Sequence, residues 1–178
     1  MLKGIGMRKA ALIASVLFVA VVSTACINSF AVHDLNNKAK MYAEKGDYTQ
    51  AIERLKSSID LDSSIVETHY NLAVVYTNVG NYTGAIEEYK KVIALKPDMA
   101  EAYYSLATAQ NNLAVDMSEE KESVNLEDSD SSFEVEDLYE DAIENYEKYL
   151  ELNPNATDKA DVEAQIQRLE EYKSKSED

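Results

Sequence analysis

Few residues of this 178-residue chain have a type and spacing suited to chemistry. The chain has one cysteine, Cys26, and two histidines, His33 and His69. Neither histidine has a second His, Cys or activated Ser at a recognisable spacing, so no catalytic pair is predicted. The five glycines are scattered, so no glycine-rich loop is available to bind phosphate. We therefore expect no enzyme, no cofactor and no small-molecule substrate.

Carboxylates are the one abundant reactive group. Acidic residues number 33 against 17 basic residues, and the formal net charge is −16. A surface of this sign repels phosphate backbones, so we expect no nucleic-acid partner. The segment Asp128-Ser129-Asp130 lacks the Gly and the terminal Glu of an EF-hand calcium loop. We expect a solvated acidic segment there and no metal site.

The residues before Cys26 have the layout of a secretory signal peptide. Basic residues, Lys3, Arg8 and Lys9, precede an uncharged apolar run over residues 10–22, and small residues follow it. The run is short for a membrane span, which needs about 20 residues. We predict a signal peptide over residues 1–25.

The place of Cys26, directly after Thr24 and Ala25, resembles the lipobox of bacterial lipoproteins. The resemblance implies that the thiol of Cys26 takes a diacylglyceryl group and that the leader is cut before it. Residues 26–31 would then be the lipid anchor and a short linker. Ser23 departs from the pattern, because an aliphatic residue is usual there. Ordinary cleavage after Ala25 and an uncleaved anchor remain alternatives. Lipidation predicts a place in a bacterial cell envelope, on the outer side of the cytoplasmic membrane or in the outer membrane.

The rest of the chain repeats one unit, which is clearest in residues 66–99. This unit has two apolar-periodic segments, joined at Gly80 and closed by Pro97, and the pattern predicts a helical hairpin. A step of 34 residues relates the unit to its neighbours. The residues related by this step include Ala39, Ala73 and Ala107, Tyr42 and Tyr76, Gly46 and Gly80, Ala51 and Ala85, and Ile52 and Ile86.

This period, with small and aromatic residues at these positions, resembles the tetratricopeptide repeat. The second helix of that repeat carries an Ala, an aromatic four residues later and a Pro after its end. Ala85, Tyr89 and Pro97 fit, as do Ala142, Tyr146 and Pro154. The resemblance implies an all-α fold, a short right-handed α-solenoid of three helix-turn-helix units with a C-terminal capping helix. The expected boundaries are repeats at 32–65, 66–99 and 100–156, then a capping helix and tail at 157–178.

The third repeat contains an insertion. Ala85 and its counterpart Ala142 are 57 residues apart, 23 more than one period. The extra stretch, about residues 115–137, is rich in carboxylates and poor in apolar residues, so it buries too little surface to offset the cost of ordering. We expect a mobile acidic loop, with Val135 and Leu138 able to extend the following helix backwards.

The resemblance also implies which residues meet a partner. In tetratricopeptide repeats the first helix lines a concave groove through the second, fifth, ninth and twelfth residues of the repeat. The groove residues predicted on this basis are Asn36, Lys40, Tyr70, Val74, Thr77, Tyr104, Thr108 and Asn111. Tyr70, Val74 and Tyr104 would form an apolar floor suited to an extended or helical peptide. Tyr104 and Thr108 stand where chaperone-binding members have basic residues, so we expect no dependence on a free C-terminal carboxylate.

The predicted function is a membrane-anchored module that binds a peptide segment or a helix of an envelope protein. The membrane contact would run through lipidated Cys26. The alternative is a structural role, as a self-associating or fixed subunit of an envelope complex. An exposed apolar flank on the last helix would favour that alternative. The identity of the partner does not follow from the sequence.

Overall fold

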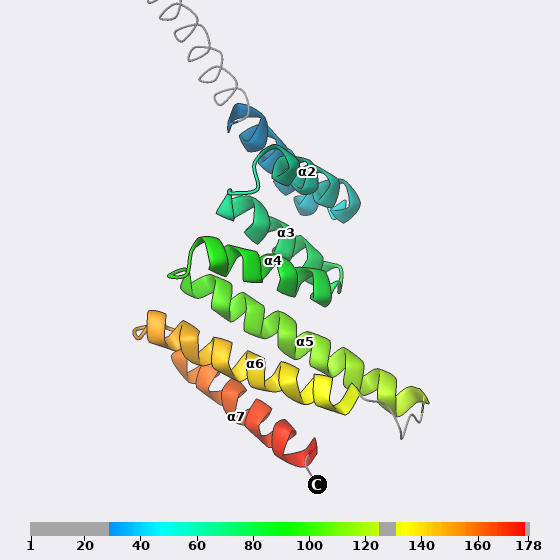
Figure 1. The fold of residues 1–178 in the computed structure, drawn as a ribbon, viewed down its shortest axis with the longest axis vertical. Coiled ribbons are helices and arrows are strands. Elements are labelled where there is room, and N and C mark those ends of the chain that lie inside the picture. The colour runs from blue at the N-terminus through cyan, green and yellow to red at the C-terminus, as the bar shows by residue number, and fades with distance from the viewer. Residues whose placement is uncertain (1–28, 125–130, 177–178) are drawn as a thin grey trace, which may run out of the picture. The chain divides into compact units, whose positions relative to one another are not determined.

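The computed structural model describes residues 29–124 and 131–176, and all regular elements in these ranges are helices (Figure 1). A helix over residues 29–44 is followed by α2 (Tyr48–Leu61), α3 (Val66–Asn78), α4 (Tyr82–Leu95), α5 (Ala100–Val124), α6 (Ser131–Leu152) and α7 (Lys159–Ser176). The predicted all-α class is confirmed. In the described ranges, no helix has both the length and the apolar composition that a membrane crossing requires. The predicted signal peptide and Cys26 lie outside the described residues.

The chain divides into two compact units, Met1–Ser63 and Ser64–Asp178. In the first unit, the helix over residues 29–44 and α2 form one hairpin. Ala39 and Ala51, at most 1% exposed, lie in its interior together with Leu55. Because alanine has a short side chain, two helices that cross at such residues can approach closely.

The turns of the first two hairpins are built in the same way. Gly46 and Gly80 have φ angles of 76° and 75°, in the left-handed region that ends helices at low cost for glycine. The next residues, Asp47 and Asn81, cap the second helix of each hairpin. Their side chains accept a hydrogen bond from the backbone N–H three residues on, at 3.2 Å and 3.1 Å. Glycine followed by Asp or Asn thus reverses the chain at the predicted place.

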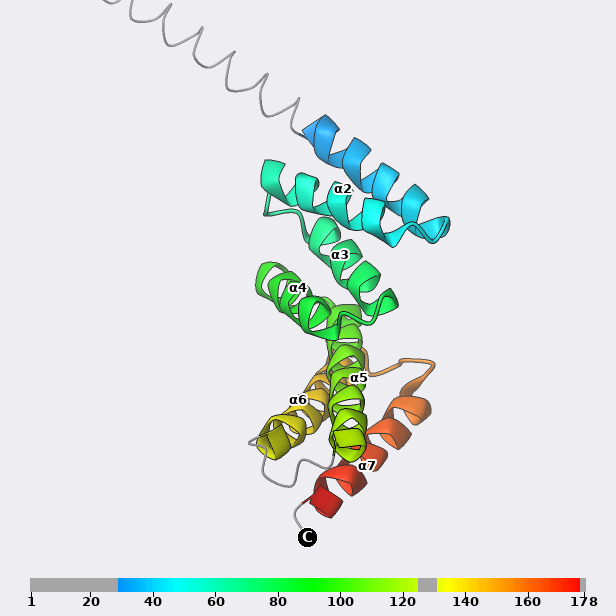
Figure 2. The ribbon, with the colours of Figure 1, turned by 90° about the vertical axis from the view of Figure 1, so that its right-hand side faces the viewer.

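In the second unit, consecutive helices from α3 to α7 pack against one another in chain order (Figures 1 and 2). The helices meet at alanines that are completely buried, and the rings of Tyr89 and Tyr146 fill the space beside them. The alanines at these meeting points include Ala73, Ala85, Ala107 and Ala142. The small and aromatic residues of the repeat therefore have the packing roles that their spacing predicts.

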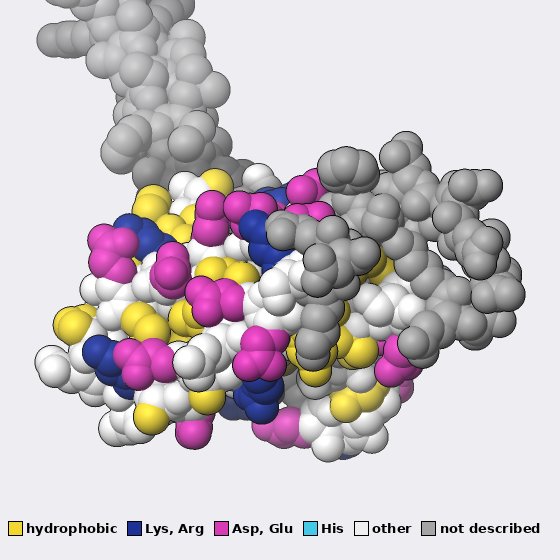
Figure 3. Space-filling view, turned by 90° about the horizontal axis from the view of Figure 1, so that it is seen from below, with side chains coloured by type: hydrophobic (Ala, Val, Ile, Leu, Met, Phe, Trp, Pro, Cys, Tyr) yellow, Lys and Arg dark blue, Asp and Glu magenta, His cyan; other side chains and the backbone are white. Residues whose placement is uncertain are grey.

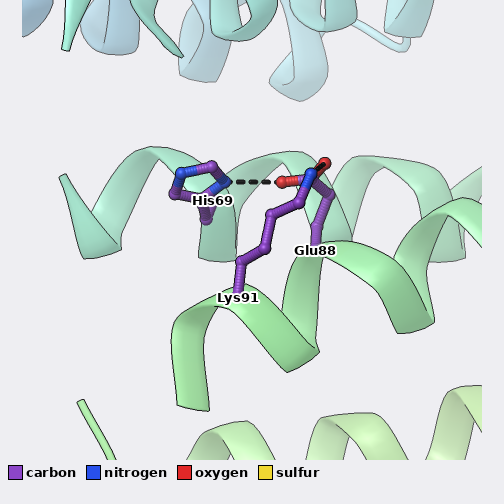
Figure 4. A network of polar contacts seen from close by, with 3 residues as sticks. All are labelled: His69, Glu88 and Lys91. Carbon is purple, nitrogen blue, oxygen red and sulfur yellow. Dashed lines mark hydrogen bonds and ion pairs between the residues drawn. The ribbon is translucent and has the colours of Figure 1, made fainter. Parts of the chain in front are cut away.

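A buried polar cluster joins α3 to α4 (Figure 4). His69 is 3% exposed, and its Nδ1 lies 2.6 Å from Glu88 Oε2. The other carboxylate oxygen of Glu88 accepts a hydrogen bond from Lys91 Nζ at 2.7 Å. A buried carboxylate that is satisfied on both oxygens fixes the pairing of two helices. His69 thus packs between the two helices, with a hydrogen bond that its place in the sequence did not indicate.

A second cluster joins α5 to α6. Gln110, 1% exposed, donates from Nε2 to Asp141 Oδ2 at 2.9 Å. Its Oε1 accepts a hydrogen bond from Asn145 Nδ2 at 2.9 Å. Gln110 stands in the third repeat at the position that Tyr42 and Tyr76 occupy in the first and second repeats. The substitution replaces an aromatic contact with a polar link between the two helices.

The insertion differs from the loop expected over residues 115–137. Residues 115–124 continue α5 and residues 131–137 begin α6, while residues 125–130 lie outside the described part. Glutamate and lysine are good helix formers, and extending an existing helix costs far less than starting one. On α6, Val135 and Tyr139 are each 7% exposed and belong to the core. The predicted backward extension of the following helix is therefore confirmed.

The last helix begins slightly later than the sequence suggested. Asp158, not Thr157, precedes it, and its carbonyl accepts the first backbone hydrogen bonds of α7. The Asp158 carboxylate also accepts a hydrogen bond from Tyr149 of α6 at 2.7 Å. Val162 and Leu169, 1% and 3% exposed, attach α7 to the core of the unit.

Candidate peptide-binding surface

The two groove residues predicted in the first unit have different environments. Asn36 is 8% exposed, and its amide donates to the carbonyl of Val32 at 3.0 Å and to Ser58 Oγ at 2.9 Å. The structure thus places Asn36 in the interior and not on the exposed surface assigned to it. The physical reason is that Ser58 of α2 offers its hydroxyl to the amide of Asn36. The amide therefore makes its hydrogen bonds inside the hairpin. Lys40 is exposed, and its role stays a prediction.

In the second unit, Tyr70 of α3 is half-buried against α4. Its ring meets Tyr89 edge to face, with centroids 5.7 Å apart and planes at 66°. Its hydroxyl lies 3.4 Å from Ser105 Oγ on α5. Val74, one turn further along α3, packs against the same core cluster. An aromatic ring supported on its inner side in this way keeps a fixed position, with part of its surface open to solvent.

The same arrangement recurs one repeat later. Tyr104 of α5 meets Tyr146 edge to face, with centroids 5.6 Å apart and planes at 68°. A third ring, that of Tyr149, lies 5.3 Å from Tyr104. Thr108 donates its hydroxyl hydrogen to the carbonyl of Tyr104 at 2.9 Å, so its Oγ1 accepts from the Tyr146 hydroxyl at 3.0 Å. Two successive first helices thus present a half-buried tyrosine held by a tyrosine of the second helix.

The two second-helix tyrosines behind this surface, Tyr89 and Tyr146, are buried. Burial raises the pKa of Tyr89 and of Tyr146 above the ordinary value of 10.0. Hydrogen bonding with Thr77 and Ser105 opposes that rise for Tyr89, and hydrogen bonding with Thr108 opposes it for Tyr146. The hydroxyls of Tyr89 and Tyr146 therefore remain neutral at physiological pH and act as hydrogen-bonding groups.

The two predicted residues that remain are Thr77 of α3 and Asn111 of α5, and both are half-buried. Thr77 donates its hydroxyl hydrogen to the carbonyl of Ala73 at 3.0 Å. Asn111 of α5 lies at a hollow of about 230 Å³ that α7 completes. The residues lining this hollow are Asn111, Val115, Gln165, Arg168, Leu169 and Tyr172. Within the second unit, the structure thus places the predicted groove residues on α3 and α5.

Gln165 and Arg168 are candidate binding residues that the sequence analysis missed, because it interpreted α7 only as a cap. The 57-residue step from Ala85 to Ala142 also takes Ala100 to Thr157. In this register α7 is the first helix of a fourth repeat, and Gln165 and Arg168 are its ninth and twelfth residues. The rule that selected Asn111 would therefore have selected them too.

The described residues of this surface give no indication of a metal site or a catalytic site. Across residues 29–124 and 131–176, no three His, Cys, Asp or Glu side chains come together as a metal site requires. The two polar clusters of the second unit are buried between paired helices. Beside the exposed carboxylates of Glu67 and Glu101, the partly exposed groups of α3 and α5 at the predicted positions are phenols, hydroxyls and an amide, which suit binding by contact and hydrogen bonding.

The comparison with protein families agrees with this geometry. A family model described as TPR repeat matches residues 39–80 and 78–113. Residues 39–113 carry tetratricopeptide (TPR) repeats. The matched stretch covers the first two hairpins from Ala39 onwards and the beginning of α5. No curated protein matches the chain in sequence.

Solved TPR structures share the fold. The first TPR domain of human RPAP3 is 21% identical with a TM-score of 0.63, over 82% of this chain and 96% of that one. The first TPR of Spaghetti (RPAP3), bound to the HSP90 peptide SRMEEVD, is 20% identical with a TM-score of 0.62, over 81% and 94%. TTC0263, a thermophilic TPR protein in Thermus thermophilus, is 16% identical with a TM-score of 0.61, over 82% and 69%. Identities this low establish the likeness of fold alone.

Proposed function

We propose that this protein is an interaction module that binds a peptide segment or a helix of a partner protein along the exposed faces of α3 and α5. The observation that carries the proposal is the repeated tyrosine pair. Tyr70 and Tyr104 are each supported from behind by a second-helix tyrosine, at 5.7 Å and 5.6 Å between centroids. A tyrosine fixed in this way offers apolar area and a hydroxyl at a small cost in side-chain entropy.

The fold supports the class of ligand. The first TPR of Spaghetti (RPAP3) is bound to a peptide in its solved structure, and this chain shares that fold. Only the general class, a peptide of another protein, is carried over. The tyrosines and hydroxyls of α3 and α5 are not a set of basic residues, so we expect the peptide to bind through its side chains and not through a free C-terminal carboxylate.

We further propose that Cys26 is lipidated and holds the module in a bacterial envelope, at the outer side of the cytoplasmic membrane or in the outer membrane. The described part of the first helix begins at residue 29, so the repeats would start close to the lipid. Loss of Lys3, Arg8 and Lys9 with the leader changes the net charge from −16 to −19. Repulsion from anionic headgroups would then hold the repeats off the surface.

The alternative function is self-association. The face that contains α7 supports it less well than it supports peptide binding. In Figure 3, which views the molecule from below the orientation of Figure 1, hydrophobic side chains on the uncovered part of this face lie in small groups among Asp, Glu, Lys and Arg. Stable interfaces between identical subunits usually have a broad apolar centre. Mass measurement of the purified protein in dilute solution separates the two functions, since a monomer leaves self-stacking without support.

The experiment that tests peptide binding starts with crosslinking in intact cells, followed by identification of the captured segment. Affinity for that segment is then measured for the wild type, Tyr70→Ala and Tyr104→Ala. Each substitution should weaken binding by roughly 1 to 3 kcal/mol, the usual cost of truncating an aromatic anchor. Glu87→Ala, an exposed change on α4, is the matched control and should bind like the wild type. Equal affinity of all variants, with circular dichroism showing an intact fold, would refute the proposal.

A further inference from the structure

The hollow between α5 and α7 combines apolar walls with a cation. Leu169 is 3% exposed at its base, while Val115 and Tyr172 are 37% and 50% exposed. The ring of Tyr172 stacks on Tyr139 of α6, with centroids 5.9 Å apart and planes at 25°. The hollow is therefore bounded by an aliphatic and an aromatic side chain, and the aromatic one is held in place.

Arg168 supplies the positive charge of this hollow. Arg168 is exposed and has no ion pair among residues 29–124 and 131–176. Other cations of the described residues, such as Lys40 and Lys90, likewise have no carboxylate within 4.0 Å, but Arg168 is the cation that lines the hollow. In a chain with 33 acidic residues, a guanidinium without a carboxylate at the edge of a hollow is available to a ligand.

The position of Arg168 connects the hollow with the tyrosine surface. Asn111 and Val115 are the twelfth and sixteenth residues of the third repeat, and Arg168 and Tyr172 hold the same positions in the fourth. Burial raises the pKa of Tyr146, and the positive charge of Arg168 partly opposes that rise. The positive charge of Arg168 thus acts on the hydroxyl of Tyr146, which is hydrogen-bonded to Thr108. A peptide lying over Tyr104 could continue into the hollow.

We propose that the hollow receives an acidic residue of the bound peptide, Asp or Glu, next to an apolar residue. This inference rests on the proposed function and adds the chemistry of the partner. The guanidinium of Arg168 would donate two hydrogen bonds to the carboxylate. The amides of Asn111 and Gln165 offer further donors. The apolar neighbour would pack on Val115 and Tyr172.

The charge of the whole chain makes this contact selective. With a net charge of −16, the protein repels a peptide carboxylate over most of its surface. A carboxylate is attracted where a cation without its own carboxylate partner lies beside an apolar wall. Complementary charge of this kind mainly fixes register and orientation. Arg168 would therefore decide which residue of the partner lies at the α7 end.

A random-peptide phage library tests the inference without knowledge of the partner. The full chain, purified in mild detergent, is used as bait in three forms: wild type, Arg168→Gln and Arg54→Gln. Arg54 is a suitable control because it lies on α2, where it donates a hydrogen bond to Gln50 at 3.4 Å. Peptides selected by the wild type and by Arg54→Gln should share an Asp or Glu beside an apolar residue, and those selected by Arg168→Gln should lack it.

Affinities of one selected peptide then isolate the contact. Replacing its acidic residue by the amide should weaken binding to the wild type by about tenfold, as expected for a hydrogen bond to a charged group. The same replacement should have no effect on Arg168→Gln, because the two changes remove one interaction. Arg168→Lys, which keeps the charge and loses the paired donors, should bind between the two.

Three results would count against the inference, and a fourth would count against the proposed function. Peptides without a common acidic residue, or equal losses in the wild type and in Arg168→Gln, would overturn the acidic-residue contact and leave peptide binding intact. Dimers formed by the wild type and not by Arg168→Gln would show that a second copy occupies the hollow. Failure of every form to enrich any peptide above an unrelated bait would instead count against the proposed function itself.

Discussion

The substitution Val135→Ala tests whether the insertion became part of the core. Val135 lies in the insertion, at the end that the sequence predicted could extend the following helix, and it is 7% exposed in the core cluster of the second unit. Removing two buried methyl groups costs about 1.6 kcal/mol at about 0.8 kcal/mol each. A cavity adds to this cost, and the better helix propensity of alanine offsets about 0.5 kcal/mol. We therefore expect a loss of about 1 to 2.5 kcal/mol in the free energy of unfolding.

Urea unfolding followed by circular dichroism measures this loss. Asp137→Ala, an exposed change two residues away on the same helix, is the control and should stay within about 0.5 kcal/mol of the wild type. The slope of the transition should be unchanged, so that the shift in midpoint reports stability alone. If Val135→Ala and Asp137→Ala unfold at the same urea concentration as the wild type, Val135 is not a core residue.

Three further predictions concern the anchor, the turns and the insertion. Cys26→Ala should abolish fatty-acid labelling and alter leader processing, and labelling that persists would exclude Cys26 as the lipidated residue. Gly80→Ala should lower stability by about 1 to 2 kcal/mol, because the φ of 75° strains any Cβ although no atom lies within 4 Å of it; an unchanged midpoint would contradict that strain. Deleting about residues 118–131 should cost less than about 2 kcal/mol, since Val135 is kept; a larger loss would show that the deleted turns are structural.

The sequence predicted the repeated parts of the fold well, because their causes are local. Gly46 and Gly80 adopt left-handed angles where the 34-residue step places a turn. Ala73 and Ala85 are completely buried where two helices meet. In each case the residue type and the repeat position are enough to state the role, since the same backbone geometry recurs.

The insertion was harder to predict because composition alone does not decide between loop and helix. Many carboxylates indicate a segment that cannot form a core of its own. Such residues can still extend a helix that is already anchored, as residues 115–124 extend α5. On the other side, Val135 and Tyr139 join the core one and two turns after Ser131, the first residue of α6. The composition of the insertion does not show that its two ends attach to α5 and α6, and this attachment is what makes them helical.

The candidate surface was predicted in part for a related reason. Repeat position identified Tyr70 and Tyr104, whose environments recur. It misplaced Asn36, because the buried partner of that amide, Ser58, belongs to α2 and is specific to the first hairpin. Contacts that a residue makes outside the repeat pattern are not encoded in the period.

Because α7 has the register of the first helix of a fourth repeat, the end of the array could bind a partner as well as cap the stack. A helix that only caps a repeat stack needs an apolar inner face and a polar outer face. Val162 and Leu169 provide that inner face. Gln165 and Arg168 add side chains at the positions through which we propose that the earlier first helices bind a partner, and together with α5 they form a hollow of about 230 Å³. The tyrosines of α3 and α5 supply apolar contact area, whereas α7 supplies charge. A peptide bound along the three helices would therefore meet a chemically distinct group at one end, and its direction would be defined.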